Sequence, residues 1–201
     1  FFHRRKVQPA MTVIRAFIAI DLPKPIQDRL AEILEKVKTP DTKAVRWVPA
    51  QNIHLTIKFL GDVSPANLTL LQNLLKVEVS RFRPFEICVA NLGAFPSVRR
   101  PRVIWVGVEA PATLPALQRA IETETVRLGY AVEDRPFSPH LTLGRVAHNA
   151  TPDDVRKVAD ILVGLKVGEL GRAMVDSVRL FRSDLQPGGA VYTPLYTTYL
   201  K

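Results

Sequence analysis

The chain has 201 residues, 47% of them hydrophobic, which is enough to bury a substantial core in one domain or in two intimate lobes. No window approaches the roughly 18 uninterrupted apolar residues of a membrane span. The single cysteine, Cys88, excludes an internal disulfide and a cysteine-rich zinc site. The net charge of +9 favours a polyanionic partner, nucleic acid foremost, but fits a merely basic surface equally well. We expect a cytoplasmic monomer without membrane contact.

The first residues of the chain are unusually basic. Arg4, Arg5 and Lys6 precede Met11, which looks like a natural start. We expect residues 1–10 to be a disordered leader or tail, and residues 11–201 to form a single bilobal domain. Without the leader the net charge is still +6 (9 − 3), so most of the basic character belongs to the folded part.

Apolar periodicity and turn residues predict the elements in chain order. The first half contains a strand at 13–20, a helix with apolar residues from 26 to 37, strands at 45–48 and 53–60, a helix starting at 64–65 and continuing through 75, and strands at 85–92 and 103–108 separated by a basic loop. The second half contains a helix at 113–128, a strand at 138–146, a helix at 151–164, and strands at 174–181 and 191–200 flanking a turn at 186–189. Strands and helices without regular βαβ alternation indicate an α+β fold with largely antiparallel sheets.

One tetrapeptide pattern occurs twice. His54-Leu55-Thr56-Ile57 returns as His140-Leu141-Thr142-Leu143, 86 positions further on (140 − 54). From average residue usage, a given histidine is followed by Leu, Thr and an aliphatic residue with a chance on the order of 10⁻³. The repetition therefore indicates two related halves that face each other across a cleft and form one paired site.

Strand alternation separates the two faces of each motif. His54 and Thr56 project to one side of an extended strand, while Leu55, Ile57 and Phe59 project to the other. The second motif repeats this arrangement. Each strand thus buries an apolar face and offers an imidazole beside a hydroxyl on its open face.

Two imidazoles and two hydroxyls suit phosphoryl transfer that involves a neighbouring ribose hydroxyl. A neutral imidazole accepts a proton from the attacking oxygen, and a protonated imidazole donates one to the departing oxygen. Threonine hydroxyls donate hydrogen bonds to the non-bridging phosphate oxygens as charge shifts in the transition state. This scheme requires neither a metal nor a cofactor.

Three other interpretations of the histidines fit the sequence less well. A lone histidine on an apolar strand is usually a hydrogen-bonded core residue, but the repeated threonine argues against that here. A zinc site lacks further ligands, since the chain has neither a cysteine cluster nor a His-Glu-x-x-His helix. A serine hydrolase lacks its Gly-x-Ser-x-Gly turn.

With their flanks, the motifs resemble those of the 2H phosphoesterase superfamily, most of all the bacterial and archaeal RNA 2′,3′-cyclic phosphodiesterases, also known as 2′-5′ RNA ligases. The likeness spans Met11 to Lys201. It rests on Arg15-Ala16-Phe17-Ile18-Ala19-Ile20, Trp47-Val48-Pro49, His54-Leu55-Thr56-Ile57-Lys58-Phe59-Leu60-Gly61, Gly93-Ala94-Phe95-Pro96, Pro101-Arg102-Val103-Ile104-Trp105 and Ser138-Pro139-His140-Leu141-Thr142-Leu143-Gly144-Arg145.

The resemblance implies a bilobal α+β fold, two related lobes each with an antiparallel sheet and outer helices around a central cleft. It implies that His54, Thr56, His140 and Thr142 are catalytic. His54 would be the proton donor to the leaving 3′ oxygen, and His140 the proton acceptor for water. The product would be a 2′-phosphate end, and the same site could support reversible 2′-5′ ligation. The implied partners are single-stranded or tRNA-like RNA ends. The alternatives are a 2H esterase for a small cyclic nucleotide or ADP-ribose cyclic phosphate, and a non-catalytic RNA-binding module.

Basic residues around the motifs are candidates for binding substrate phosphates. Arg102 belongs to the densest basic cluster, with Arg99 and Arg100, for which a solvated loop is an equal alternative. Lys58 shares the His54 face by strict alternation. Arg145 does not share the His140 face by that count, so its role requires a strand end or a bulge near Gly144.

Aromatic residues near the motifs are candidates for stacking on a base. Phe95, in the predicted loop before the basic cluster, is the one we expect to do so. Trp47 and Trp105 lie on predicted strands, where a tryptophan usually belongs to the core.

Overall fold

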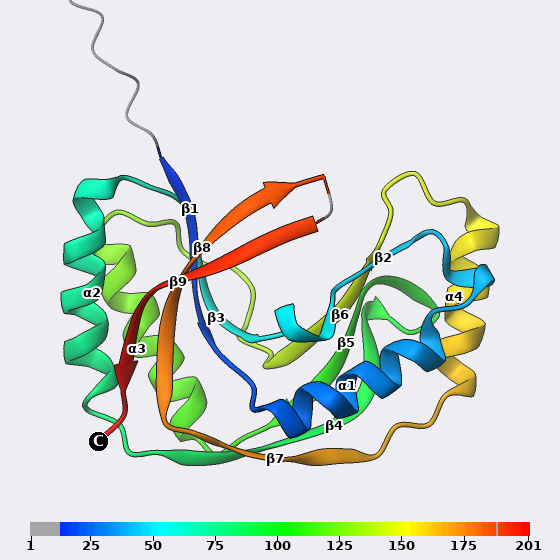
Figure 1. Cartoon of the computed structure of the whole chain (residues 1–201), viewed down its shortest axis with the longest axis horizontal. Coiled ribbons are helices and arrows are strands. Elements are labelled where there is room, and N and C mark those ends of the chain that lie inside the picture. The colour runs from blue at the N-terminus through cyan, green and yellow to red at the C-terminus, as the bar shows by residue number, and fades with distance from the viewer. Residues whose placement is uncertain (1–12, 188) are drawn as a thin grey trace, which may run out of the picture.

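The computed structural model describes residues 13–187 and 189–201 (Figure 1); the expected leader at 1–10 lies outside them. Over the described ranges, nine strands form one antiparallel sheet. The strands are β1 (Ile14–Ile20), β2 (Val45–Trp47), β3 (Leu55–Val63), β4 (Phe85–Ser97), β5 (Arg100–Glu109), β6 (His140–Val146), β7 (Glu169–Val175), β8 (Ser177–Gln186) and β9 (Gly189–Tyr199). The helices are α1 (Lys24–Val37), α2 (Pro65–Val79), α3 (Thr113–Arg127) and α4 (Pro152–Gly164), with short 3-10 turns η1 (Pro40–Thr42) and η2 (Ala50–Asn52).

The sheet has two halves joined at its centre. The strand order is β7-β4-β5-β6-β3-β1-β8-β9, and β2 adds to β6. Between β3 and β6 the register contains one antiparallel pair, Leu55 with Leu141. These are equivalent residues of the two motifs, and antiparallel pairing of equivalent residues creates a local twofold axis. The neighbours obey the same symmetry, since Ile20 on β1 pairs with Leu55 and Val106 on β5 pairs with Leu141.

The helices cover the outer face of each half. Helices α2 and α3 pack on each other, α3 contacts β3, and α2 contacts β8 and β9. Helix α4 contacts β5, and α1 contacts β7. β1 lies in the half of the sheet that contains β3 and β8, whereas α1, the next element in the chain, packs on β7 of the other half (Figure 1). The chain therefore passes from one half to the other directly after its first strand. The expected α+β fold with antiparallel sheet halves and outer helices is confirmed, and the central pair makes the two halves one sheet.

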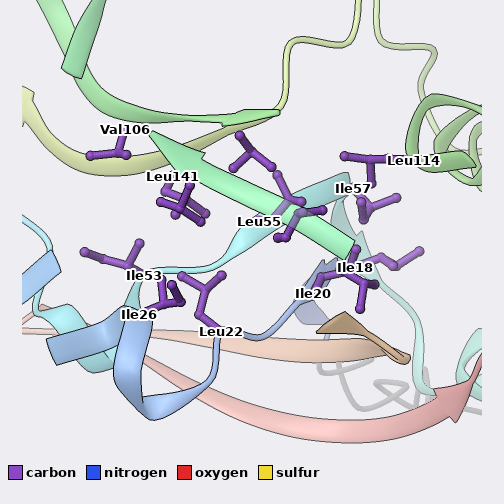
Figure 2. Packing of buried hydrophobic residues seen from close by; sticks show 14 of the residues in the cluster. Ile18, Ile20, Leu22, Ile26, Ile53, Leu55, Ile57, Val106, Leu114 and Leu141 are labelled. Carbon is purple, nitrogen blue, oxygen red and sulfur yellow. The ribbon is translucent and has the colours of Figure 1, made fainter. Parts of the chain in front are cut away.

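A continuous core lies between the sheet and its helices. Leu55 and Leu141 are both 0% exposed, and Figure 2 shows them beside Ile57, Val106 and Ile18. Since alternate side chains of a strand point to opposite faces, residues next to these leucines point to the other, open face. Burial of the shared leucine pair thus orients both histidine motifs at once.

Helix starts were predicted well because their signals are local. Thr151 accepts a hydrogen bond from the Asp154 backbone N–H at 3.1 Å, and its own N–H donates to the Asp154 carboxylate at 3.0 Å. Pro152 follows at the first helical position, where no N–H is needed. Ser64 caps α2 in the same manner, accepting from the Ala66 N–H at 3.3 Å.

Two strand predictions were wrong. The predicted basic loop is a tight hairpin, because β4 continues to Ser97 and β5 begins at Arg100. Pro96 and Pro101, a residue type that strand interiors usually exclude, pair with each other near the end of this hairpin. The predicted strand at 174–181 is two strands, since β7 ends at Val175 and β8 begins at Ser177. β7 pairs only with β4, and such an edge strand lacks a clear apolar pattern.

Candidate active site

The central pair of the sheet brings the two motifs together. His54 directly precedes β3, and His140 is the first residue of β6. Extending the Leu55–Leu141 register by one residue in each direction puts His54 opposite Thr142 and Thr56 opposite His140. Residues that are opposite in antiparallel strands share a face, so all four side chains lie on the open side. In a regular ladder, diagonal neighbours such as the two histidines are roughly 7–8 Å apart.

Both imidazoles are held by a backbone carbonyl two residues earlier. Nδ1 of His54 lies 2.8 Å from the Asn52 carbonyl oxygen, and Nδ1 of His140 lies 2.7 Å from the Ser138 carbonyl oxygen. A carbonyl oxygen only accepts, so each Nδ1 carries the proton. Each Nε2 is then the nitrogen left for chemistry, as an acceptor in the neutral ring and a donor in the imidazolium. Asn52 and Ser138 are themselves separated by the 86-residue offset (138 − 52).

The two histidines have different electrostatic surroundings. Burial lowers the pKa of both, because it disfavours the charged ring, and each backbone hydrogen bond opposes this. The nearby charges differ in sign. Asp21 acts to raise the pKa of His54, whereas Arg145 lowers the pKa of His140 further. Burial is the larger influence on both rings, and the nearby charges break the internal symmetry, since the charge near His54 favours its protonated form and the charge near His140 favours its neutral form.

Aromatic side chains surround His54 on the open face. Its ring stacks on Phe17, with centroids 4.7 Å apart and an interplanar angle of 23°. Tyr192 meets it edge-on at 5.2 Å, and Phe181 lies beyond Phe17 at 5.3 Å from that ring. With Ala19, the phenylalanines form a small apolar cluster separate from the main core. The His54 ring packs against this cluster.

The aromatic residues beside His140 belong to the other half of the sheet, on β4 and β5. Phe95 meets the His140 ring edge-on at 5.1 Å, and Trp105 lies 6.4 Å away. Phe95 therefore lies beside the motif as expected, although on β4 and not in a loop. Trp105 is half-buried, with its ring on the open side of the sheet, where it pairs with Thr142.

Sequence reasoning missed Phe181, Phe17 and Tyr192. The sequence did contain a signal for Phe181, because it follows Phe95 by the same 86 residues (181 − 95) that separate the two histidines. The pairing repeats as well, because Phe181 pairs with Phe17 and Phe95 with Val103. Tyr192 had no such signal, because it reaches His54 only through the fold of β8 and β9.

Matched bulges follow the two motifs. The partners of Ile18 and Ala19 on β1 are Lys58 and Thr56, so Ile57 is the extra residue on β3. The partners of Ile104 and Trp105 on β5 are Gly144 and Thr142, so Leu143 is the extra residue on β6. Each bulge reverses the alternation for the residues that follow it. On β3 a second bulge, with Leu60 as the extra residue, comes directly after Phe59.

The bulge on β6 turns Arg145 to the open face. Arg145 is exposed and pairs with Val103 on β5 and with Arg46 on β2. The bulge that its proposed role requires is therefore present. Arg46, which sequence reasoning missed, shares this face as its direct cross-strand partner. The equivalent bulge on β3 turns Phe59 to the open face with 61% of it exposed, so the prediction that Phe59 shares the buried face is wrong.

The same bulge turns Lys58 away from the histidines. Its side chain is 3% exposed, and Nζ forms an ion pair with Glu122 of α3 at 2.8 Å and donates to the carbonyl oxygen of Ala131. The prediction that Lys58 shares the His54 face is wrong, because Lys58 pairs with Ile18, which belongs to the core. Its charge is satisfied inside the protein.

Arg102 also lies on the other side of the sheet. Arg102 is the extra residue of a bulge on β5, because Phe95 pairs with Val103 and Pro96 pairs with Pro101. Its side chain is exposed beside α4, which packs against β5. The expectation of a cation near Phe95 and His140 is therefore not met by Arg102. Arg102 lines a depression beside α4, together with Arg99 and Arg100.

The β8–β9 hairpin links the two halves across the site. The side chain of Asn52, in η2, donates a hydrogen bond to the Ala190 carbonyl oxygen at 3.0 Å. Tyr192 follows on β9 and is half-buried between His54 and the positive charges of Arg145 and Arg15. Burial raises the pKa of Tyr192, and these two charges oppose the shift. Its hydroxyl therefore stays protonated at neutral pH.

The described part of the chain contains no group of three or more His, Cys, Asp or Glu side chains arranged to hold a metal ion. None of its helices is both long and apolar enough to cross a membrane.

A duplicated antiparallel sheet that presents two His-x-Thr motifs on one face defines a two-histidine phosphoesterase of the 2H superfamily. The chain belongs to the LigT-like phosphoesterase family, because the model described as LigT like Phosphoesterase matches it twice, over residues 20–105 and 106–192. The two matches begin 86 residues apart (106 − 20), which is the offset between the histidines.

Relatives of known name cover nearly the whole chain. An RNA 2′,3′-cyclic phosphodiesterase of Methanothermobacter thermautotrophicus is 38% identical over 182 residues, covering 90% of this chain and 96% of the relative. One of Archaeoglobus fulgidus is 34% identical, covering 90% and 98%. Among solved structures, E. coli LigT complexed with 3′-AMP superposes with a TM-score of 0.74 at 29% identity, covering 94% of this chain and 99% of LigT.

Proposed function

We propose that this protein hydrolyses 2′,3′-cyclic phosphate ends of RNA to 2′-phosphate ends by metal-independent acid–base catalysis between His54 and His140. The observation that carries the proposal is the central Leu55–Leu141 pair, which orients both imidazoles to one face. The names of the relatives at 38% and 34% identity support the RNA substrate. RNA ends, single-stranded or tRNA-like, are the proposed partners.

In the proposed step, Nε2 of His140 accepts a proton from water as the water oxygen bonds to phosphorus. The bond between phosphorus and the 3′ oxygen breaks, and Nε2 of His54 donates a proton to that oxygen. The phosphate stays on the 2′ oxygen. Thr56 and Thr142 donate hydrogen bonds to its non-bridging oxygens, where negative charge grows in the transition state.

The assignment of acid and base rests on the neighbouring charges. A carboxylate stabilises the imidazolium form, so Asp21 supports His54 as the acid. A guanidinium stabilises the neutral form, so Arg145 supports His140 as the base. Arg145 also has the position to bind a phosphate oxygen, and Phe95 has the position to stack on the terminal base.

The test is turnover of an RNA oligonucleotide that ends in a 2′,3′-cyclic phosphate, in the presence of EDTA. The expected product carries only a 2′-phosphate. His54→Ala and His140→Ala should each lower kcat by about 10²- to 10⁴-fold while the circular dichroism spectrum is kept. A cyclic end that persists with the wild-type protein contradicts the proposal.

The same experiment separates the alternatives. Equal turnover of a cyclic mononucleotide and an oligonucleotide would indicate an esterase for small cyclic phosphates. RNA binding that survives both alanine variants, without turnover by the wild-type protein, would indicate a non-catalytic module. With a 5′-hydroxyl of a second RNA in place of water, the same site would form a 2′-5′ bond, and we propose this ligation as a secondary activity, to be measured as joined product.

A further inference from the structure

A basic depression lies on the outer side of the sheet, away from the histidines. It has a volume of about 750 Å³ and lies between the β4–β5 hairpin and α4. Three arginines, Arg99, Arg100 and Arg102, come from the hairpin and β5, and Arg156 comes from α4. We call this feature the outer arginine groove.

The charges of the groove are not balanced by the protein. Arg99, Arg100 and Arg102 are exposed, and none of them forms an ion pair with any residue in the described ranges. Arg156 pairs with Asp153, and Asp160 is the one carboxylate among the lining residues. Three adjacent guanidinium groups repel one another, and a row of phosphates relieves that repulsion with bidentate hydrogen bonds.

The floor of the groove is apolar. Val155, Ala159 and Val163 of α4 line it, and Val163 is 65% exposed. Arginines on one wall with aliphatic side chains below suit a chain that offers both phosphates and unpaired bases. A duplex offers mainly its phosphates, because its bases are stacked inside. The groove therefore fits a single strand better than a duplex.

The hairpin connects this groove to the proposed active site. Phe95 contacts His140 on the open face, and the next residue, Pro96, lines the groove. Along β5, Arg102 and Arg100 lie three and five residues from Trp105, roughly 10 and 17 Å at about 3.4 Å per residue. A strand of several nucleotides that leaves His140 around the hairpin tip reaches the arginines.

We propose that the outer arginine groove binds the phosphodiester backbone of single-stranded RNA several nucleotides upstream of the reacting end. This inference rests on the proposed function for the identity of the bound strand. The groove adds affinity for long substrates, whereas the histidine face alone handles the terminal phosphate. Substrate length is then recognised outside the cleft.

The test replaces Arg99, Arg100 and Arg102 together with glutamine. The matched control replaces Lys76, Arg83 and Arg119 with glutamine, which removes the same charge from exposed positions on or next to α2 and α3 that form no ion pair within the described residues. Binding is measured by fluorescence anisotropy with a single-stranded RNA of about 12 nucleotides that ends in a hydroxyl. Turnover of a 2′,3′-cyclic mononucleotide is measured in parallel.

The groove variant should bind the RNA about tenfold more weakly at moderate salt, and the slope of log K against log salt should fall by about 2. The control should stay within about twofold of wild type, and both variants should keep their mononucleotide turnover. Equal weakening by both variants, no weakening, or an equal loss with duplex RNA overturns the inference. Because the binding RNA has no cyclic end, the groove result stands even when the wild-type protein fails to hydrolyse cyclic ends, which would refute only the proposed function.

Discussion

His54 and His140 are equivalent by internal symmetry, but they meet charges of opposite sign. Asp21 lies near the first and Arg145 near the second. The residues equivalent to these two are Gly107 and Phe59, which carry no charge. One charged residue in each half therefore gives the two equivalent histidines different electrostatic surroundings, and the proposed division into an acid and a base rests on this difference.

Asp21→Asn should lower the pKa of His54, because it removes a charge that stabilises the imidazolium. Arg145→Gln should raise the pKa of His140, because it removes a charge that opposes protonation. NMR titration of the ring protons measures both. Asp21 also forms an ion pair with Arg179, so Arg179→Gln is the control for loss of that contact alone. If Asp21→Asn leaves the His54 titration in place, the proposed division of roles loses its electrostatic basis.

In a sequence, a lysine that forms a buried ion pair cannot be told from a lysine that binds substrate, and Lys58 is of the first kind. Lys58→Met should destabilise the protein by about 3 kcal/mol, because it leaves the largely buried Glu122 carboxylate without its partner. Adding Glu122→Gln should restore part of that loss in urea unfolding. The KM for a cyclic-ended RNA should remain at the wild-type value. A large rise in KM with unchanged stability would mean that Lys58 binds phosphate after all.

The element that fixes the geometry of the site is the bulged strand. β3 and β6 both carry an extra residue directly after the His-x-Thr pair, and this turns Phe59 and Arg145 outward. A bulge is set by the partner strand, so the sequence of one strand does not reveal it. At some glycines of the sheet, side chains of the neighbouring strand lie so close that an added Cβ would clash with them.

Gly93→Ala tests this packing. A Cβ at this position would lie 2.2 Å from the ring of Trp105, so the ring must move. We expect about 1–3 kcal/mol of destabilisation from overpacking and a lower kcat, since Trp105 lies beside His140. Gly168→Ala is the control, because its Cβ would meet nothing within 4 Å. Thermal unfolding and activity measurements check both variants. Equal stability and equal kcat of the two variants would contradict the expectation that Trp105 supports His140.

At the scale of the whole molecule, stability and protonation are linked through the two histidines. Their pKa values are lowered in the folded state by burial, while the unfolded values stay near 6.5. Between the folded and unfolded pKa values the unfolded chain binds more protons. The stability contributed by the neutral rings is therefore complete above about pH 6.5 and is lost as the pH falls through the folded pKa values.

Urea unfolding at a series of pH values from about 8 to 5 measures this dependence. The free energy of unfolding of the wild-type protein should fall over this range. The double variant His54→Gln and His140→Gln should show a smaller fall, because glutamine does not titrate. An identical pH dependence in both proteins would show that the two rings titrate alike in the folded and unfolded states.

The sequence by itself determined the repeated motif, the helix starts and the open face of His54, Thr56, His140 and Thr142. Such features depend on residues close together in the chain, through capping hydrogen bonds and the two-residue alternation of a strand. Only the tertiary structure decided that β3 and β6 pair at Leu55 and Leu141, which makes two half-sites into one.

The tertiary structure also decided which of the expected substrate-binding residues lie near the histidines. Arg145 and Phe95 lie on the open face, whereas Lys58 and Arg102 lie on the other side of the sheet. The physical reason is that a side chain keeps its predicted face only while the register is regular. One bulged residue reverses the alternation, and the partner strand that imposes the bulge is distant in the sequence.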